Sequence, residues 1–288
     1  MTDQQSQYLL EPEQLQARLN EPGLRIFDTA VTLQVKEGGY QALSGQQDYE
    51  GAHVPGAAFL DLIKALSDTG SGLGFTLPAA RDLAQRVGAQ GIAADSPVVL
   101  YSSGHIMWAT RAFWLLYSLG HERVQVLNGG LRAWKAAGLP AQSGVEQYAA
   151  SEYEAKPRTN AFVDLAQMQA LVAAGEQQTT CALTADVYAG TGDFHYGRRG
   201  HIPGSTHLYY DELLDDGAFP ALSDLRTRLA AAQFDGAAPV VSYCGGGIAA
   251  TVLSFARLLC GCGETAVYDG SMSEWVRAGE PLREGVQP

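Results

Sequence analysis

The chain carries the same series of motifs twice, and this internal repeat limits the folds that it can adopt. In the first half GAHVPGA (51–57) is followed by PVVLYSSGHIMWATRAFWLLYSLG (97–120) and VQVLNGG (124–130). In the second half the same order returns as RGHIPGS (199–205), PVVSYCGGGIAATVLSFARLLCG (239–261) and AVYDGS (266–271). Three anchor pairs are offset by 141 or 142 residues: Pro97/Pro239, Asn128/Asp269 and Trp134/Trp275. The repeat predicts two homologous domains.

The length of the chain agrees with two domains. A chain of 288 residues exceeds the usual size of a single hydrophobic core. Residues 143–156 are polar and lack strong periodicity, which is typical of a linker. We therefore expect a first domain over residues 1–142 and a second over residues 157–288.

Within each copy, short apolar runs alternate with helical patterns. The expected strands are Leu24–Thr29, Val98–Tyr101, Val124–Leu127, Thr180–Thr184, Val240–Tyr243 and Ala266–Tyr268. The expected helices are Pro12–Leu19, Met107–Leu119, Leu131–Ala137, Val163–Ala173, Asp224–Gln233, Ile248–Leu259 and Met272–Ala278. Apolar strands separated by helices predict an α/β fold, with a parallel sheet covered by helices on both faces in each domain. Ligands of such folds bind beyond the carboxyl ends of the strands.

Composition and charge exclude several classes of function. The formal net charge is −12 and no cluster of Lys and Arg occurs, so we expect no nucleic-acid partner. No run of 18 apolar residues is present, and the polar start lacks the features of a secretory signal, so we expect a cytoplasmic protein without a membrane span. The four cysteines lack metal-ligand spacing, which indicates free thiols in a reducing compartment and no bound metal.

The segment around Cys244 carries the clearest chemical signal. Cys244 follows an apolar strand, and Gly245, Gly246 and Gly247 separate it from the next helix. Three glycines allow several backbone N–H groups to turn toward one point, and the helix adds free N–H donors and the positive end of its dipole. This environment would stabilise a thiolate and bind an anion. In the alternative interpretation, Cys244 is a small buried apolar residue and the glycines only form a turn.

Two other uses of the loop are disfavoured by the residues present. Cysteine phosphatases require an Arg six residues after the nucleophile to bind the phosphate, and Ala250 occupies that position. A serine-hydrolase elbow would need a GxSxG motif, which is missing from the chain. The residues of the loop therefore disfavour phosphoryl transfer and a serine-hydrolase mechanism.

Three segments of the second half, GHIPGS (200–205), YCGGGIAA (243–250) and YDGSMSEW (268–275), resemble the tandem-domain rhodanese family of thiosulfate and 3-mercaptopyruvate sulfurtransferases. The resemblance covers nearly the whole chain, and the first half is similar to the inactive domain of that family. Ser102 stands there where the second half has Cys244. A hydroxyl without a base would not carry sulfur, so the resemblance implies an inactive first domain and a catalytic second domain.

The resemblance also implies the reaction and the residues of the site. Cys244 would take a sulfane sulfur from a small anionic donor as a persulfide and pass it to cyanide or a thiol acceptor, without a metal or an organic cofactor. Backbone N–H groups from Gly245 through Gly246, Gly247 and Ile248 to Ala249 would stabilise the charge. Ser271 would lie near the loop, although it could equally cap the following helix. Met107 and Trp108 would form a wall at the domain interface, or simply pack there.

The identity of the donor stays open between thiosulfate and 3-mercaptopyruvate. The loop CGGGIAA lacks the basic residues of thiosulfate enzymes, which favours mercaptopyruvate. Asp186 and Gly190, however, stand where mercaptopyruvate enzymes have Arg. The remaining cations near the motif are Arg198 and Arg199, which could bind an anionic donor or simply be solvated. A different hypothesis is a non-catalytic relay module, in which a protein partner loads or unloads Cys244.

Overall fold

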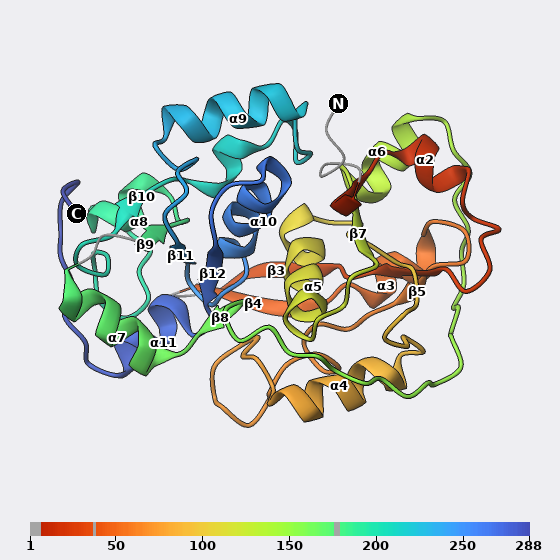
Figure 1. Cartoon of the computed structure of the whole chain (residues 1–288), viewed down its shortest axis with the longest axis horizontal. Helices are drawn as coiled ribbons and strands as arrows, with labels where there is room; N and C mark the ends of the chain where they lie inside the picture. Colours follow the sequence, from red (N-terminus) through yellow and green to blue (C-terminus); the bar gives the residue numbers. More distant parts are fainter. Residues whose placement is uncertain (1–6, 37–38, 176–178) are drawn as a thin grey trace.

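A computed structural model describes residues 7–36, 39–175 and 179–288 of the chain. It contains two α/β domains side by side, each built on a five-stranded parallel sheet with flanking helices (Figure 1). The predicted fold class is therefore confirmed. The first sheet has the order β1-β7-β6-β2-β5, and the second, read in the same direction, has the order β8-β12-β11-β9-β10. The internal repeat of the sequence thus appears as a repeated topology.

The elements of the first domain follow the first copy of the repeat. The strands of its sheet are β1 (Leu9–Leu10), β2 (Arg25–Asp28), β5 (Ala58–Phe59), β6 (Val98–Tyr101) and β7 (Val124–Leu127). The helices are α2 (Pro12–Gln16), α3 (Gln46–Gly51), α4 (Ala80–Ala89), α5 (Ile106–Ser118) and α6 (Gly130–Ala136). Strand β6 is buried along its whole length, since α5 and the other helices cover both faces of the sheet.

The second domain repeats this plan. Its strands are β8 (Phe162–Val163), β9 (Thr179–Cys181), β10 (Thr206–His207), β11 (Val240–Tyr243) and β12 (Thr265–Tyr268). Its helices are α7 (Leu165–Ala174), α8 (Ala185–Ala189), the 3₁₀ helix η1 (Tyr210–Leu213), α9 (Leu222–Ala231), α10 (Ala250–Cys260) and α11 (Ser271–Arg277). The central strand β11 leads directly into the Cys244 loop, and α10 follows that loop.

The first domain also contains a β-hairpin that the sequence analysis did not predict. Strands β3 (Val31–Lys36) and β4 (Gly39–Ser44) pair antiparallel, with Leu33 opposite Ala42 and Val35 opposite Tyr40. The hairpin extends from the first domain toward the second (Figure 1), where its Tyr40 meets Phe194. Alternation of apolar and polar residues gives it an apolar face with Leu33, Val35, Tyr40 and Ala42.

The two domains pack through equivalent helices, α5 of the first and α10 of the second. Phe113 and Phe255 meet edge to face with ring centroids 4.7 Å apart. The hydroxyls of Thr110 and Thr251 lie 2.8 Å apart in a buried hydrogen bond. Because both helices are apolar on nearly all sides, each is buried between its own sheet and the other domain.

The segment between the domains lies along the surface of the first domain. The hydroxyl of Tyr148 accepts a hydrogen bond from the Ile26 N–H at 3.0 Å and donates one to the Gly56 carbonyl at 2.7 Å. The N–H of Ser151 donates to the Gly88 carbonyl at 2.9 Å. Residues 143–156 have the extended course expected of a linker, but they are fixed to one domain. The exact domain boundaries stay a prediction.

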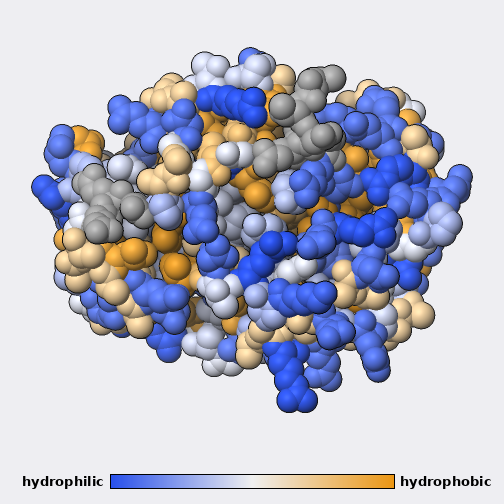
Figure 2. Space-filling view, viewed as in Figure 1, coloured by the Kyte–Doolittle hydropathy of each residue, from blue (hydrophilic) through white to orange (hydrophobic). Residues whose placement is uncertain are grey.

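Hydrophilic residues cover most of the face seen in Figure 2, with smaller hydrophobic areas between them. In the part of the chain that the structure describes, no helix combines the length and the apolar character needed to cross a membrane.

Asp28, at the end of β2, is a carboxyl group with no exposed surface. Its Oδ1 accepts hydrogen bonds from the N–H groups of Ala30 at 3.0 Å and Ser103 at 3.1 Å, whereas Oδ2 has no partner among the described residues. Burial raises the pKa of Asp28 from 3.8 to about 6. The native state therefore binds a proton at this site more tightly than the unfolded chain does.

Replacement of Asp28 by Asn should remove the pH dependence of the stability that the Asp28 carboxyl group causes. The Asp28 contribution to stability is fully present below about pH 4 and is lost as the pH rises to about 6, because the native pKa is raised. We expect the free energy of unfolding of the wild type, relative to Asp28→Asn, to fall by roughly 2–3 kcal/mol over this range. Urea unfolding at several pH values measures it, with the exposed Asp48→Asn as control. Parallel pH profiles for wild type and Asp28→Asn would contradict this assignment.

Candidate active site

Cys244 lies at the bottom of a cavity between the two domains. It follows β11 at the carboxyl end of the sheet, where α/β folds bind their ligands, and only 2% of its surface is exposed. The cavity has a volume of about 670 Å³. The first domain contributes Leu33, Tyr40, Ala42, Gly74, Phe75, Met107 and Trp108 to its lining. The second contributes Leu183, Phe194, His195, Tyr196, Gly197, Tyr210, Cys244, Gly245, Gly246, Ile248, Ala249 and Ser273.

The loop after Cys244 carries a group of free backbone donors. Among the described residues, no acceptor is found for the N–H groups of Gly245, Gly246, Ile248, Ala249 and Ala250. All of these residues except Ala250 line the cavity, and α10 begins at Ala250. Free N–H groups at the start of a helix form a binding site for an anion or a thiolate. The structure therefore places the expected donors beside Cys244.

Gly247 differs from the expectation for this loop. Its N–H donates to Ser271 Oγ at 3.1 Å, and Gly247 is absent from the cavity lining. Its φ of +74° turns the chain in a direction that residues with a side chain rarely adopt. A Cβ at this position would also overlap the Asp269 carbonyl. Gly247 thus shapes the loop, while its neighbours carry the available donors.

The side chain of Ser271 binds the backbone of the Cys244 loop on the side away from the cavity. Its Oγ accepts hydrogen bonds from the N–H groups of Cys244 at 3.0 Å and Gly247 at 3.1 Å, and it donates to the Tyr268 carbonyl at 2.8 Å. Ser271 is fully buried and does not line the cavity. Its side chain makes no capping bond to α11. Its place in the structure is that of a positioning residue beneath the loop, rather than a contact for substrate.

Arg111, from α5 of the first domain, was missed by the sequence analysis. Its side chain is 1% exposed and donates to the Gly247 carbonyl at 3.1 Å, to Asp269 Oδ1 at 2.7 Å and to the Phe75 carbonyl. Asp269 Oδ2 in turn accepts the Leu77 N–H at 2.7 Å. This network ties the Cys244 loop to the first domain. A cation that is buried and paired on all sides holds its partners in a fixed arrangement.

The walls of the cavity are aromatic and neutral. Tyr40 and Phe194 have ring centroids 5.5 Å apart, and Phe194 and Tyr196 have centroids 5.0 Å apart. Phe75 and Trp108 form another pair at 5.3 Å. The pKa of Tyr196 is raised by burial and then by the nearby Cys244, so its phenol stays uncharged at neutral pH. No Lys, Arg, Asp or Glu of the described chain lines the cavity.

The structure places the two predicted substrate-binding arginines outside this cavity. Arg198 is exposed and donates to the Glu280 carbonyl at 2.8 Å. Arg199 is exposed and donates to the carbonyls of Gly190 and Gly192. Each guanidinium group thus binds backbone oxygens outside the cavity. By contrast, the predicted wall residues Met107 and Trp108 do line the cavity.

Cys244 is the only cysteine of the described chain that lines the cavity. Burial raises the pKa of Cys181 to about 12 and that of Cys260 to about 12, and it also raises the pKa of Cys262. These thiols stay protonated at neutral pH and are poor nucleophiles. The equivalent loop of the first domain carries Ser102, whose Oγ accepts the Gly104 N–H at 3.0 Å.

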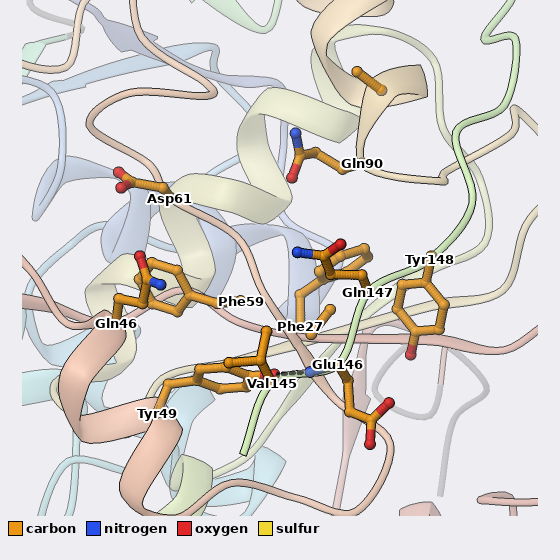
Figure 3. A pocket seen from close by; sticks show the side chains of 12 residues that line it. Phe27, Gln46, Tyr49, Phe59, Asp61, Gln90, Val145, Glu146, Gln147 and Tyr148 are labelled. Carbon is orange, nitrogen blue, oxygen red and sulfur yellow. Dashed lines mark hydrogen bonds between the residues drawn. The ribbon is translucent and has the colours of Figure 1, made fainter.

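A second hollow, of about 370 Å³, lies between the first domain and the linker segment that runs along it (Figure 3). Phe27, Tyr49 and Tyr148 supply its aromatic rings, and the Glu146 N–H donates to the Tyr49 hydroxyl at 2.9 Å. The carboxylates of Asp61 and Glu146 are its charged groups. Among the described residues, no thiol and no Lys, Arg or His side chain lines it.

Two sequence signals could have revealed the missed parts of the Cys244 cavity. The alternation of Val31, Leu33 and Val35 with polar residues is the period of a strand, and it predicts the hairpin. The run Phe194–His195–Tyr196 places three rings in a segment otherwise rich in polar residues and glycine. No local pattern marks Arg111, because its partners lie 136 and 158 residues away.

The fold and the site together define an α/β protein of two similar domains, with a cysteine in a loop whose backbone amides lack acceptors among the described residues. The model of the rhodanese-like domain matches residues 11–137 and 176–278. The chain is 35% identical over 280 residues to the probable 3-mercaptopyruvate sulfurtransferase of Pseudomonas aeruginosa, which covers 94% of this chain and 95% of that protein. It is 30% identical over 239 residues to the thiosulfate sulfurtransferase of Gallus gallus, covering 82% of each.

A solved structure shows the same architecture. SseA from Escherichia coli, a 3-mercaptopyruvate sulfotransferase with the rhodanese fold, superposes with a TM-score of 0.80 at 27% identity, covering 92% of this chain and 98% of SseA. The chain belongs to the rhodanese family, with the family domain present in two copies. It is accordingly an enzyme of the sulfurtransferase class.

The conformation of the loop predicts that alanine substitutions at two adjacent glycines affect the rate of sulfur transfer differently. Gly247→Ala should lower the rate of sulfur transfer at least tenfold, because a side chain at φ +74° costs about 1–2 kcal/mol and would also displace the Asp269 carbonyl. Gly246→Ala should stay within a few-fold of the wild type, because the nearest atom to its Cβ would be the Gly74 carbonyl oxygen at 3.9 Å. Steady-state kinetics of both variants measure this, and equal losses would contradict the assigned roles.

The Arg111 network predicts a loss of reactivity beyond any loss of stability. Lys at position 111 cannot reproduce the fork of contacts, so Arg111→Lys should slow alkylation of Cys244 by iodoacetamide about tenfold or more as the loop moves. Arg257, which is equally buried and binds the carbonyls of Gly236 and Ala238, provides the matched control. Arg257→Lys should lower the Tm but leave the alkylation rate unchanged. Similar alkylation rates in the two variants would show that Arg111 is only structural.

Proposed function

We propose that Cys244 carries sulfur as a persulfide between a small anionic donor, thiosulfate or 3-mercaptopyruvate, and a thiol or cyanide acceptor. The observation that carries the proposal is the set of N–H groups that lack acceptors in the described part of the chain, beside Cys244, which lines the cavity. These groups would stabilise the thiolate, the bound anion and the charge that develops as sulfur moves. Relatives named after each of the two donors support both as candidates.

The first half-reaction loads the cysteine. The Cys244 thiolate attacks the outer sulfur of the donor and forms a new S–S bond. With thiosulfate, the old S–S bond breaks and sulfite leaves with the electron pair. With 3-mercaptopyruvate, the C–S bond breaks and the enolate of pyruvate leaves with the pair and takes a proton from water. With either donor, negative charge develops on the leaving group beside the loop amides. These amide dipoles are already oriented toward the cavity, so they can stabilise the charge without reorganising.

The second half-reaction unloads the persulfide. An acceptor thiolate attacks the outer sulfur, the bond between that sulfur and Cys244 Sγ breaks, and Cys244 leaves as a thiolate. The acceptor departs as a persulfide, or as thiocyanate when cyanide is the acceptor. The donor and the acceptor together supply all the electrons of the reaction. No further oxidant or reductant is needed. The free cysteines of the chain suit a reducing compartment, and we place the enzyme in the cytoplasm.

Separate alanine substitutions of Cys244 and of Ser102, its equivalent in the first domain, test the proposal. Cys244→Ala should abolish sulfur transfer from both donors, whereas Ser102→Ala should leave it nearly intact, because the serine hydroxyl has no base to activate it. Intact-mass spectrometry after incubation with each donor should show a gain of one sulfur atom in the wild type and in Ser102→Ala, but not in Cys244→Ala. Transfer retained by Cys244→Ala would require another nucleophile. Loading without turnover on small acceptors would instead indicate a relay to a protein partner.

A further inference from the structure

The cavity above Cys244 is larger and less polar than the proposed donors require. Thiosulfate and mercaptopyruvate are small anions, and the loop amides are the anion-binding groups present. The remaining volume, out of about 670 Å³, is open to solvent on one side and lined mainly by aromatic and aliphatic side chains. A volume of this size corresponds to pockets that bind ligands much larger than such anions. Most of the cavity is thus left for the second substrate.

The charge of the lining argues against a second charged substrate. No Lys, Arg, Asp or Glu of the described residues contributes to it, and Arg198 and Arg199 are engaged elsewhere. The buried phenols of Tyr196 and Tyr210 have raised pKa values and stay neutral. Outside the loop amides, a free carboxylate or ammonium group entering this space would lose hydration without meeting an oppositely charged Lys, Arg, Asp or Glu side chain of the described residues. An apolar group would gain from the same desolvation.

The β3–β4 hairpin extends the apolar surface from the cavity to the solvent. Leu33, Tyr40 and Ala42 lie on its apolar face and line the cavity, and Tyr40 meets Phe194 of the second domain. Leu33 is nevertheless 44% exposed, Val35 75% and Tyr40 58%. Exposed apolar side chains concentrated at the rim of a catalytic cavity are typical of a binding site for an apolar ligand. The opposite face of the hairpin carries Thr32, Gln34 and Gln41, with Leu43 as its one large apolar residue.

We propose that the sulfur acceptor of this enzyme is a thiol carried on an uncharged apolar body of about the size of an aromatic ring, bound between the hairpin and the Phe194–Tyr196 segment. This inference rests on the proposed function, since it names the substrate of the second half-reaction. The acceptor thiolate reaches the outer sulfur of the Cys244 persulfide from the cavity side, while its apolar body displaces water from the aromatic walls. Sulfur then leaves on the acceptor as an organic persulfide.

Single-turnover unloading tests the proposal. Cys244 is first loaded with thiosulfate or 3-mercaptopyruvate, and loading is verified by intact mass. The persulfide protein is then mixed with 2-phenylethanethiol, 2-mercaptoethanol, 3-mercaptopropionate or cysteamine, and rates are compared at equal thiolate concentration. We expect the aromatic thiol to react at least tenfold faster than the polar neutral, anionic and cationic thiols, in keeping with burial of a ring-sized apolar surface. Equal rates, or a preference for a charged thiol, would overturn the proposal.

Two leucines of the hairpin provide a matched pair of variants. Leu33 lines the cavity, whereas Leu43 lies on the other face and is similarly exposed, at 38% against 44%. Leu33→Ala should reduce the preference for the aromatic thiol several-fold, and Leu43→Ala should leave it unchanged. A preference that survives Leu33→Ala, or falls equally in both variants, would overturn the assignment of the site. Failure of Cys244 to gain sulfur at the loading step would instead refute the proposed function, and the acceptor proposal with it.

Discussion

The hydroxyl of Ser271 fixes the shape on which the site depends. By accepting the N–H groups of Cys244 and Gly247, it closes the loop into a turn and leaves the N–H groups between and after them without an acceptor among the described residues. Unpaired buried donors are costly in a folded protein, and they persist only where the surroundings enforce them. Here the left-handed conformation of Gly247 and the buried contacts of Ser271 supply that constraint. The same constraint that leaves these donors unpaired also creates a preorganised environment for negative charge.

The first domain completes the cavity around Cys244, although it has a serine at the position equivalent to this cysteine. Ser102 replaces the cysteine, yet the first domain provides Arg111 to the Cys244 loop, Trp108 to the cavity wall and the β3–β4 hairpin to its rim. These groups reach the second domain because α5 and α10 pack against each other along the interface. The site is incomplete without this interface. The first domain therefore supplies walls and positioning groups to a cavity whose cysteine belongs to the second domain.

The predictable parts of the structure are those that local sequence controls. Strands β6, β7 and β11 match the expected ranges because a continuous apolar run is needed to fill a sheet buried on both faces. The edge strands β1, β5, β8 and β10 span two residues each and leave no periodic signal. The position of Cys244 in its glycine loop was likewise readable from sequence. Arg111 and the outward course of Arg198 and Arg199 depend on tertiary packing, which no local pattern encodes.

The neutral cavity also bears on how an anion can bind inside an acidic protein. With a net charge of −12, the protein as a whole repels anions, and no Lys or Arg of the described residues lines the cavity to offset this effect. Surface charges are screened within about 8–10 Å at physiological ionic strength, whereas the loop amides that line the cavity would contact a bound anion directly. The attraction of an anion to this site therefore depends on the local donors. Because these donors are uncharged, the site can stabilise an anion and still present apolar walls to the partner that removes the sulfur.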